Sequence, residues 1–457
     1  MEKAHDTQGE GHAVQIVRAN KDRTFSLDEE ALARVLHQDH CKNKPVAIIS
    51  VTGALRTGKS FLLNFILRYL KKQGRKGWQG PEDSPLTGFK WRGGHERETT
   101  GILVWSEVFL IGTPTGEIAI LLMDTQGAFD SESTVKDWAT IFSLSAMISS
   151  IQVLNLLHNI QEDNLQNLQL FIDYGKLALK DTECKPFQKL LFLVRDWSYS
   201  YDAPYGIHGG QQIIDQTLQV SEKQHPELQA LRKHIKACFT SIKCFLMPHP
   251  GLKVATDPQF TGKLTEIEQD FQEQLVSLME SLFTPSNIVV KEIDGMNIKT
   301  KDILHYFKSY SRIYNGRELP DPKTVLEATA VANNLSAMAT AKEWYINKMK
   351  EVFKDSGPYI DPATLIKHHV TLKNSAIDSF TEELKMGSAN LSKEYKMELK
   401  KEIEASFKLF NENNEIKRQV VDERKKNMLP SVVLATAVII VAIVKPDVLI
   451  PIFSKIF

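Results

Sequence analysis

The chain has 457 residues, 42% of them hydrophobic and 25% charged, and its 56 Lys and Arg residues balance its 56 Asp and Glu residues. This is the composition of an ordinary globular protein with room for about two or three domains. A net charge of zero gives no general argument for a nucleic-acid partner, and we expect none. The cysteines lack CxxC spacing and follow no apolar secretory segment, so we expect reduced thiols facing the cytosol at Cys41, Cys184, Cys238 and Cys244.

Three continuous apolar runs indicate an α/β domain in the first part of the chain. They are VAIISV (46–51), IAILLM (118–123) and KLLFLV (189–194). Such runs are typical of strands that are buried on both faces of a mostly parallel sheet. The segment KSFLLNFILRYLKK after Gly58 predicts a helix, so a strand, a glycine-rich loop and a helix follow one another.

After about residue 316 the pattern changes to that of amphipathic helices. RELPDPK carries two prolines and interrupts the chain. Beyond it, three stretches have apolar residues at spacings of three and four, which predicts a three-helix bundle whose aromatic and Met side chains are core residues rather than cofactor ligands. These stripes are Val331, Leu335, Met338, Ala341, Tyr345, Met349 and Val352, then Leu365, Leu372, Ala376, Phe380 and Leu384, then Leu399, Ile403, Phe407 and Phe410.

An uncharged stretch of 17 residues, Met428 to Val444, lies near the C-terminus. As a helix it measures about 25 Å, against roughly 27–30 Å for the hydrocarbon core of a thin bilayer, so it is just long enough to span. A buried core helix is the alternative, but a helix that is apolar all round needs a large protein around it. The preceding DERKK segment favours a cytosolic side for the N-terminal domains. The last ten residues are too short to span and are expected along the luminal interface.

A glycine-rich loop follows the first apolar run. GALRTGKS matches the pattern G-x-x-x-x-G-K-S/T between a strand and a helix, the context that a phosphate-binding loop requires. The glycines allow a tight backbone whose N–H groups surround the phosphates, Lys59 reaches the β- and γ-phosphates, and the Ser60 hydroxyl binds Mg²⁺. A chance glycine turn is the alternative, and the flanking elements argue against it. We assign to the nucleotide site Gly53, Leu55, Arg56, Thr57, Gly58, Lys59, Ser60 and Phe61.

Two further motifs are expected near the metal and the γ-phosphate. LLMDTQG ends an apolar run with Asp124, placed to act near Mg²⁺, and Gly127 offers a backbone N–H to the γ-phosphate. ERETTG supplies Thr99 and Thr100, whose hydroxyls are candidates to close on Mg²⁺. Position alone leaves an ordinary loop hydroxyl equally open for either threonine.

The base is expected at the end of the third run, where KLLFLVRDWS places Arg195 and Asp196. A carboxylate there accepts from both N1–H and the exocyclic amine of guanine, whereas adenine offers no such pair of donors. The segment NKPV, which starts at Asn43, is no guanine motif because it lacks the Asp and precedes the phosphate loop.

The position after DxxG, where Ras-like proteins use a glutamine to orient water, is Ala128. The charge that develops on the phosphates still needs a cation, and Arg56 in the phosphate loop is the candidate for an arginine finger supplied in cis. Spacing alone leaves a surface arginine equally open.

Five segments together closely resemble the atlastin family of dynamin-like GTPases, which fuse endoplasmic reticulum membranes. They are GALRTGKSFLLNFILRY, PLTGFKWRGGHERETTGI, LLMDTQGAFD, FLVRDWS and PHPGLKVAT. The resemblance covers residues 13 to about 410. It implies an α/β P-loop GTPase domain, a linker, an all-α three-helix middle domain and a membrane segment. We place these, after a flexible N-terminus at 1–12, at residues 13–290, 291–318, 319–420 and 428–457.

The resemblance also implies roles for single residues. By this resemblance Arg56 is the arginine finger supplied in cis and Thr99 is the switch threonine. Arg195 and Asp196 recognise guanine. Val254 in GLKVAT covers the base, and Arg92 and Arg97 match switch-region arginines near the nucleotide and the dimer face. The implied cofactors are GTP or GDP and Mg²⁺, with Arg56, Lys59 and Thr99 in catalysis and Ser60, Thr99 and Asp124 around the metal.

The family further implies a homodimer, formed through the GTPase and middle domains across two endoplasmic reticulum membranes, that tethers and fuses them. In one respect the chain departs from the family, which carries a hairpin of two membrane segments and an amphipathic tail. One marginal span followed by a ten-residue apolar segment therefore leaves an alternative, a GTP-dependent membrane tether with little fusion activity. A soluble guanylate-binding-type defence GTPase fits the first domain but not Met428 to Val444.

Overall fold

The computed structural model describes residues 11–20, 24–54, 57–91, 101–127, 135–169, 173, 184–314, 320–355, 359–383 and 385–444, with backbone alone at 135, 136, 138, 355 and 425–444. Contacts divide the chain after Asn333 into two compact units, which are described separately.

The first unit is built around a sheet that has nine strands within the described ranges, in the order β2-β1-β4-β6-β3-β7-β8-β9, with β5 paired to β6. The strands are β1 Ala13–Ala19, β2 Phe25–Leu27, β3 Val46–Gly53, β4 Ile102–Trp105, β5 Phe109–Thr113, β6 Gly116–Thr125, β7 Ile151–Leu157, β8 Phe187–Arg195 and β9 Phe239–Leu246. The three apolar runs of the sequence lie in β3, β6 and β8, as predicted. A small hairpin, β10 Glu292–Ile293 and β11 Met296–Asn297, lies apart from this sheet.

The expectation of a mostly parallel sheet is only partly right. The strands β6, β3, β7, β8 and β9 pair in parallel. The strands β2, β1, β4 and β5 make antiparallel pairs that extend the sheet beyond β6. These strands are short or partly exposed, so they lack the continuous apolar runs that mark a strand covered on both faces.

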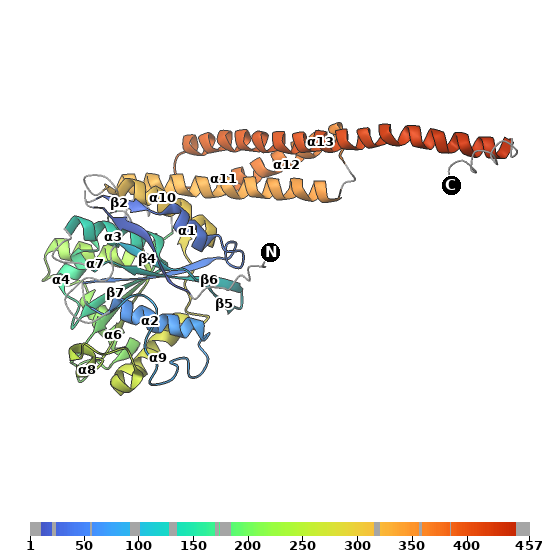
Figure 1. Ribbon diagram of the computed structural model, residues 1–457. Coiled ribbons are helices and arrows are strands. Elements are labelled where there is room, and N and C mark those ends of the chain that lie inside the picture. Colours follow the sequence, from blue (N-terminus) through green and yellow to red (C-terminus); the bar gives the residue numbers. More distant parts are fainter. Residues whose placement is uncertain are drawn as a thin grey trace. The chain divides into compact units, whose positions relative to one another are not determined.

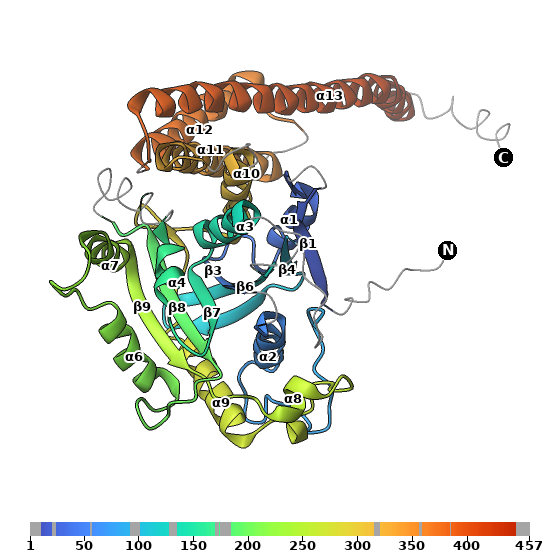
Figure 2. The ribbon, with the colours of Figure 1, turned by 90° about the vertical axis from the view of Figure 1, so that its left-hand side faces the viewer.

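Helices cover both faces of the sheet (Figures 1 and 2), with α2, α6 and α9 on one face and α1, α3 and α10 on the other. The helices of the first unit are α1 Glu29–Leu36, α2 Lys59–Lys71, α3 Val135–Ile148, α4 Glu162–Gln166, α6 Gly206–Thr217, α7 Pro226–Cys238, α8 Leu252–Thr256, α9 Gln269–Phe283 and α10 Ile303–Tyr314. Short 3-10 turns form at Leu264–Glu266 and Thr300–Asp302.

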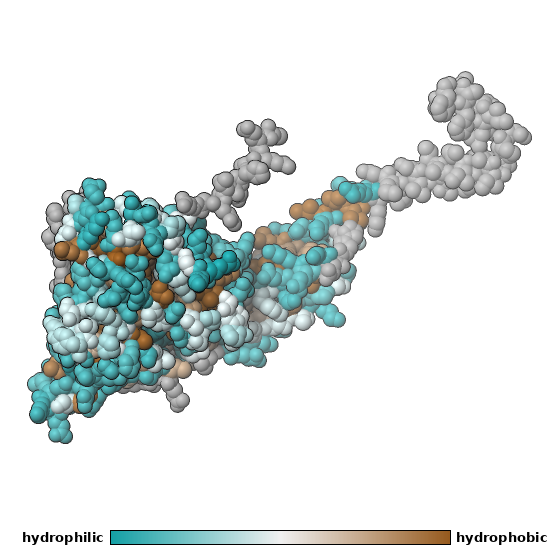
Figure 3. Space-filling model, turned by 90° about the horizontal axis from the view of Figure 1, so that it is seen from below, coloured by the Kyte–Doolittle hydropathy of each residue, from teal (hydrophilic) through white to brown (hydrophobic). Residues whose placement is uncertain are grey.

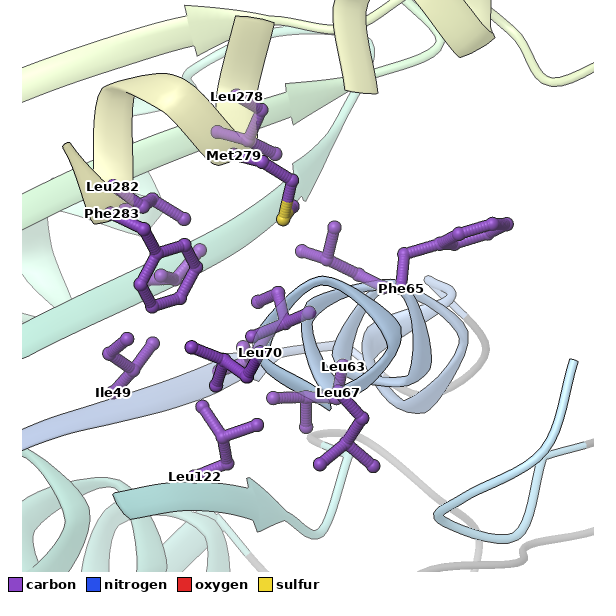
Figure 4. Packing of buried hydrophobic residues seen from close by; sticks show 14 of the residues in the cluster. Ile49, Leu63, Phe65, Leu67, Leu70, Leu122, Leu278, Met279, Leu282 and Phe283 are labelled. Carbon is purple, nitrogen blue, oxygen red and sulfur yellow. The ribbon is translucent and has the colours of Figure 1, made fainter. Parts of the chain in front are cut away.

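The core holds α2 between the sheet and α9 (Figure 4). Leu63 and Leu70 of α2 belong to the same buried cluster as Ile49 of β3, to which α9 adds Leu278 and Phe283. Each fully buried side chain of this size contributes roughly 1.5–3 kcal/mol by leaving water. Burial on this scale fixes the start of α2, and with it the phosphate loop, against the sheet.

The three helices predicted in the second part of the chain are present. They are α11 Pro322–Asp355, α12 Pro362–Glu382 and α13 Ala389–Val444. Within the second unit the predicted stripes form a core, in which Met338, Tyr345, Phe380 and Ile403 are buried. Asn414 ties α13 to the chain before α12, because its side chain exchanges two 2.8 Å hydrogen bonds with the backbone of Ile360.

The backbone of α13 continues through the stretch from Met428 to Val444, and residues 445–457 lie outside the described residues. In the ranges that the structure covers, no helix is both long and apolar enough to cross a membrane. The four cysteines are free thiols, as expected, with Cys184 exposed and Cys41, Cys238 and Cys244 buried.

Candidate nucleotide site

The candidate site lies at the carboxyl ends of the central parallel strands, the edge of an open α/β sheet where ligands bind. Strand register brings its residues together, since Val51 pairs with Asp124, Gly53 pairs with Asn155, and Leu157 pairs with Arg195. Residues from four strands, distant in sequence, therefore meet around the end of β3.

The loop from β3 to α2 needs its two glycines. At Gly53 φ is +153° and an added Cβ would lie 2.2 Å from the carbonyl oxygen of Asn155. At Gly58 φ is +77°, a left-handed conformation, and an added Cβ would lie 3.3 Å from Nη1 of Arg195. A side chain at either position would strain the backbone or push the neighbouring strand away.

Hydrogen bonds within the loop hold the phosphate end of the site. Lys59 is only 6% exposed, and its Nζ donates to the carbonyl oxygen of Ala54 at 2.8 Å. Thr57 Oγ1 donates to the same oxygen at 2.9 Å. Because α2 begins at Lys59, the free N–H groups and positive dipole end of its first turn face the same region. This arrangement suits a bound phosphate.

Ser60 and Asp124, the two predicted metal ligands on described elements, are in direct contact. Ser60 Oγ donates to Oδ2 of Asp124 at 2.6 Å, and Asp124 is fully buried at the end of β6. A hydroxyl and a carboxylate at this separation are hard oxygen donors, which fit Mg²⁺. No group of three or more His, Cys, Asp or Glu side chains forms a metal site among the described residues. An ion here would therefore share its coordination with phosphate and water.

The DxxG segment is tied to Gly101, the residue directly before β4. Gln126 Oε1 accepts a hydrogen bond from the backbone N–H of Gly101 at 2.9 Å, and the N–H of Gln126 donates to the Gly101 carbonyl at 2.8 Å. Gly127 is buried directly beyond this pair. The two segments that approach the γ-phosphate in the expected arrangement are thus coupled through Gln126.

Arg195 occupies the base end as a buried side chain, 4% exposed. Its guanidinium lies 5.3 Å from the centre of the Phe271 ring, a cation–π contact from α9. Its Nε and Nη1 have no hydrogen-bond partner among the described residues. Burial lowers the pKa of Arg195, and the carboxylate of Asp196 acts against this shift. Buried donors without acceptors cost free energy, which a ligand that offers acceptors relieves.

Asp196 has a φ of +58°, uncommon for any residue with a side chain. Two flanking contacts hold this turn: His158 N–H donates to the Arg195 carbonyl at 2.8 Å, and Trp197 N–H to the Met247 carbonyl at 3.0 Å. This left-handed turn bends the chain at the residue directly after the end of β8. Val254, on the short helix α8, is half-buried and packs against the same core as Phe271.

Several expected site residues lie outside the described residues, and their roles stay predictions. These are Leu55, Arg56, Arg92, Arg97, Thr99, Thr100 and Ala128.

Phe61 packs its ring 5.1 Å from the Trp91 ring and 6.1 Å from the Phe260 ring, so its backbone rather than its side chain is the group left for phosphate.

Two residues that contribute to the site were not predicted from the sequence. Asn155 Nδ2 donates to the Thr57 carbonyl at 2.8 Å, and Phe271 supports Arg195. Neither belongs to a local motif, and pairing across the sheet or packing against α9 places each.

Residues 22–292 match the family model of the guanylate-binding protein N-terminal domain. The chain is 50% identical to Atlastin of Drosophila melanogaster over 434 residues, which covers 94% of this chain and 80% of that protein. It is 50% identical to Atlastin-2 of Homo sapiens over 428 residues, 93% of this chain and 73% of the relative. Atlastin-3 of Homo sapiens is 51% identical over 406 residues, 88% and 75% of the two chains.

The phosphate loop, the Ser60–Asp124 pair and the family match define a GTPase that binds guanine nucleotide through a guanylate-binding-type domain. The chain belongs to the atlastin family of dynamin-like GTPases.

Proposed function

We propose that this GTPase is a mechanoenzyme of endoplasmic reticulum membranes, anchored by residues 428–457 with its N-terminal domains in the cytosol. Two copies dimerise in trans through their GTPase and middle domains and use GTP hydrolysis to tether and fuse the two membranes. The observation that carries the proposal is the extent of the similarity, since 50% identity to a protein named Atlastin runs over 434 residues and includes the helical unit.

In this proposal each residue at the phosphate end has a separate role. Lys59 neutralises charge on the β- and γ-phosphates, while Ser60 and Asp124 hold Mg²⁺, with Thr99 as a third ligand. The ion would supply charge stabilisation as the γ-phosphate leaves. Binding then exchanges the contacts of Lys59 with Ala54 and of Ser60 with Asp124 for contacts with the nucleotide. Arg56 stabilises the developing charge in place of a glutamine at position 128.

The base end supports guanine recognition. Asp196 accepts from N1–H and the exocyclic amine, and Nε and Nη1 of Arg195, which have no acceptor among the described residues, donate to the nucleotide. Val254 covers the base. Because Arg195 lies against Gly58, the base end contacts the phosphate loop directly.

The test is lipid mixing between two populations of liposomes that carry the full chain, measured beside GTP turnover. Mixing that requires GTP and is blocked by a non-hydrolysable analogue supports fusion. Clustering of liposomes that needs GTP but leaves lipids unmixed supports the tether instead.

GTP turnover with neither clustering nor mixing would reject the membrane function while leaving the GTPase intact. The control is the Lys59→Ala variant, which removes the phosphate-binding ammonium and is expected to abolish turnover, clustering and mixing together.

A further inference from the structure

The end of α2 that lies away from the nucleotide carries a group of cations around a hollow. Lys71, Lys72, Arg75 and Lys76 line a cavity of about 680 Å³ that the buried Trp78 also lines. All four cations are exposed, and no acidic residue of the described ranges lines the hollow. Lys71 Nζ lies 5.2 Å from the centre of the Trp105 ring, and none of the four forms an ion pair within the part of the chain that the structure describes. This basic hollow is thus a concentration of unneutralised positive charge.

Aromatic packing and hydrogen bonds hold the residues around the basic hollow in place. Trp78 packs edge-on against Tyr69, with ring centres 5.2 Å apart, and Tyr69 stacks on Phe283 at 5.3 Å. Arg68 donates to the carbonyl oxygens of Gln79 and Pro85 at 2.7 and 2.8 Å, which ties the following loop to α2. The cations therefore project from a fixed base rather than from a free loop.

Helix electrostatics explain only part of this charge. Cations in the last turn of a helix interact favourably with its negative dipole end, which accounts for Arg68 and Lys71. Arg75 and Lys76 lie beyond the end of α2, where this effect has faded. Glu280 of α9 contributes, after burial, to the raised pKa of Tyr69, but it does not line the hollow. The like charges repel one another, and a bound anion would remove that repulsion.

The side chains present favour phosphate groups as ligands. Arg75, whose Nη2 donates to Oε1 of Gln73 at 3.1 Å, keeps the other donors of its planar guanidinium for a phosphate, and the lysines add point charges around it. The face of this unit over α2, α6, α8 and α9 is mostly hydrophilic (Figure 3), as expected for a ligand that is charged rather than apolar. The hollow involves one helix end and one loop, so it offers no long groove along which a nucleic-acid strand would track.

We propose that the basic hollow binds a ligand that carries two or more phosphate groups, at a site separate from the nucleotide site. The two sites lie at opposite ends of α2, about 18 Å apart along the helix axis. The same chemistry is offered by a soluble polyphosphate and by the headgroup of a phosphorylated inositol lipid, and experiment separates the two.

The first test uses inositol hexakisphosphate as the probe, with the full chain in detergent and GDP saturating the nucleotide site. Binding is measured by isothermal titration calorimetry for the wild type, the triple variant Lys72→Gln, Arg75→Gln, Lys76→Gln, and a control. The control, Lys223→Gln, Lys233→Gln, Lys236→Gln, removes three exposed cations near and on α7. We expect at least tenfold weaker binding in the triple variant, because it removes three of the four cations that line the hollow.

Unchanged affinity in the triple variant, or an equal loss in the control, would overturn the proposal, as would tighter binding of a thymidine oligonucleotide than of the probe. Unaltered GDP affinity in the triple variant shows that it is folded.

The second test places the chain in phosphatidylcholine nanodiscs and measures flotation with phosphatidylcholine vesicles, with or without 5% phosphatidylinositol bisphosphate. Retention that needs the inositol lipid and the intact hollow supports a membrane headgroup. Probe binding without retention supports a soluble ligand.

Discussion

The two ends of the central sheet both bury polar groups, but they do so in different ways. At the carboxyl ends of the strands, Arg195 is buried with Nε and Nη1 lacking a partner among the described residues. At the amino end of β3, Lys291 is 1% exposed and its backbone N–H donates to the Val46 carbonyl. Its Nζ does have an acceptor, the Ser149 carbonyl at 3.1 Å.

This difference distinguishes Arg195, whose donors are available to a ligand, from Lys291, whose burial affects only stability. Burial lowers the pKa of Lys291 to about 7, so the fold holds this amine at the edge of losing its charge. Its Nζ already donates to the Ser149 carbonyl, and loss of the proton lowers the number of N–H groups that need an acceptor. Arg195 keeps its charge throughout the ordinary pH range, and its Nε and Nη1 have no acceptor among the described residues, so an acceptor on a ligand would stabilise it. Changes at the carboxyl end should therefore alter nucleotide chemistry, and changes at the amino end should alter stability alone.

The largest effect is expected at Arg56. Arg56→Ala should retain nucleotide binding but lose at least ~10³-fold in GTP turnover, the low end for arginine fingers, because position 128 offers no glutamine. It should also dimerise poorly if the finger acts only in the dimer. Turnover by phosphate release and affinity by a fluorescent nucleotide provide the measurement. The exposed Arg34 of α1 gives the matched control, Arg34→Ala, and near-normal turnover in Arg56→Ala would refute the assignment.

A smaller effect, on binding and specificity, is expected at Asp196. Asp196→Asn replaces an acceptor with a donor, which should weaken GTP binding roughly 10- to 100-fold and improve binding of XTP, whose C2 carries a carbonyl. Competition titration with both nucleotides measures the change. Asp202→Asn, an exposed aspartate in the following loop, should leave both affinities as they are. An unaltered GTP affinity in Asp196→Asn would mean that another group recognises the base.

Sequence patterns predicted the parts of this site that are local, and missed those that pairing across the sheet creates. Gly53, Ser60 and Asp124 follow directly from a motif and from the end of an apolar run. Asn155 contributes because β7 pairs beside β3 in a register that sets it against Gly53, which no local pattern encodes. The antiparallel strands were missed because β1 has only two buried residues and carries no continuous apolar run.

Substitution of Asn155 is expected to have a moderate effect on both stability and GTP binding. Asn155→Ala removes the donor to the buried Thr57 carbonyl, which should lower the free energy of unfolding by about 1–3 kcal/mol. Because that bond positions the phosphate loop, GTP affinity should fall as well, and saturating GTP should recover less stability than in the wild type. Urea denaturation with and without GTP measures this. Asn287→Ala, at an exposed asparagine, is the control, and equal stability of the two variants would show that the bond is not needed.

The smallest effect on activity, and the sharpest test of the comparison, is expected at Lys291. The pKa of this amine is about 7 in the folded chain and about 10.4 in an unfolded one. Between these values the unfolded chain binds one proton more than the folded chain, so stability rises with pH, by up to about 1.4 kcal/mol per pH unit. Lys291→Met should remove this part of the rise between pH 7 and 9 while leaving GTP turnover unchanged. Denaturation at pH 7, 8 and 9 measures the slope, with the exposed Lys233→Met as control. A slope equal to that of the wild type would show that Lys291 stays charged in the fold, and altered turnover would show that the two ends of the sheet are not independent.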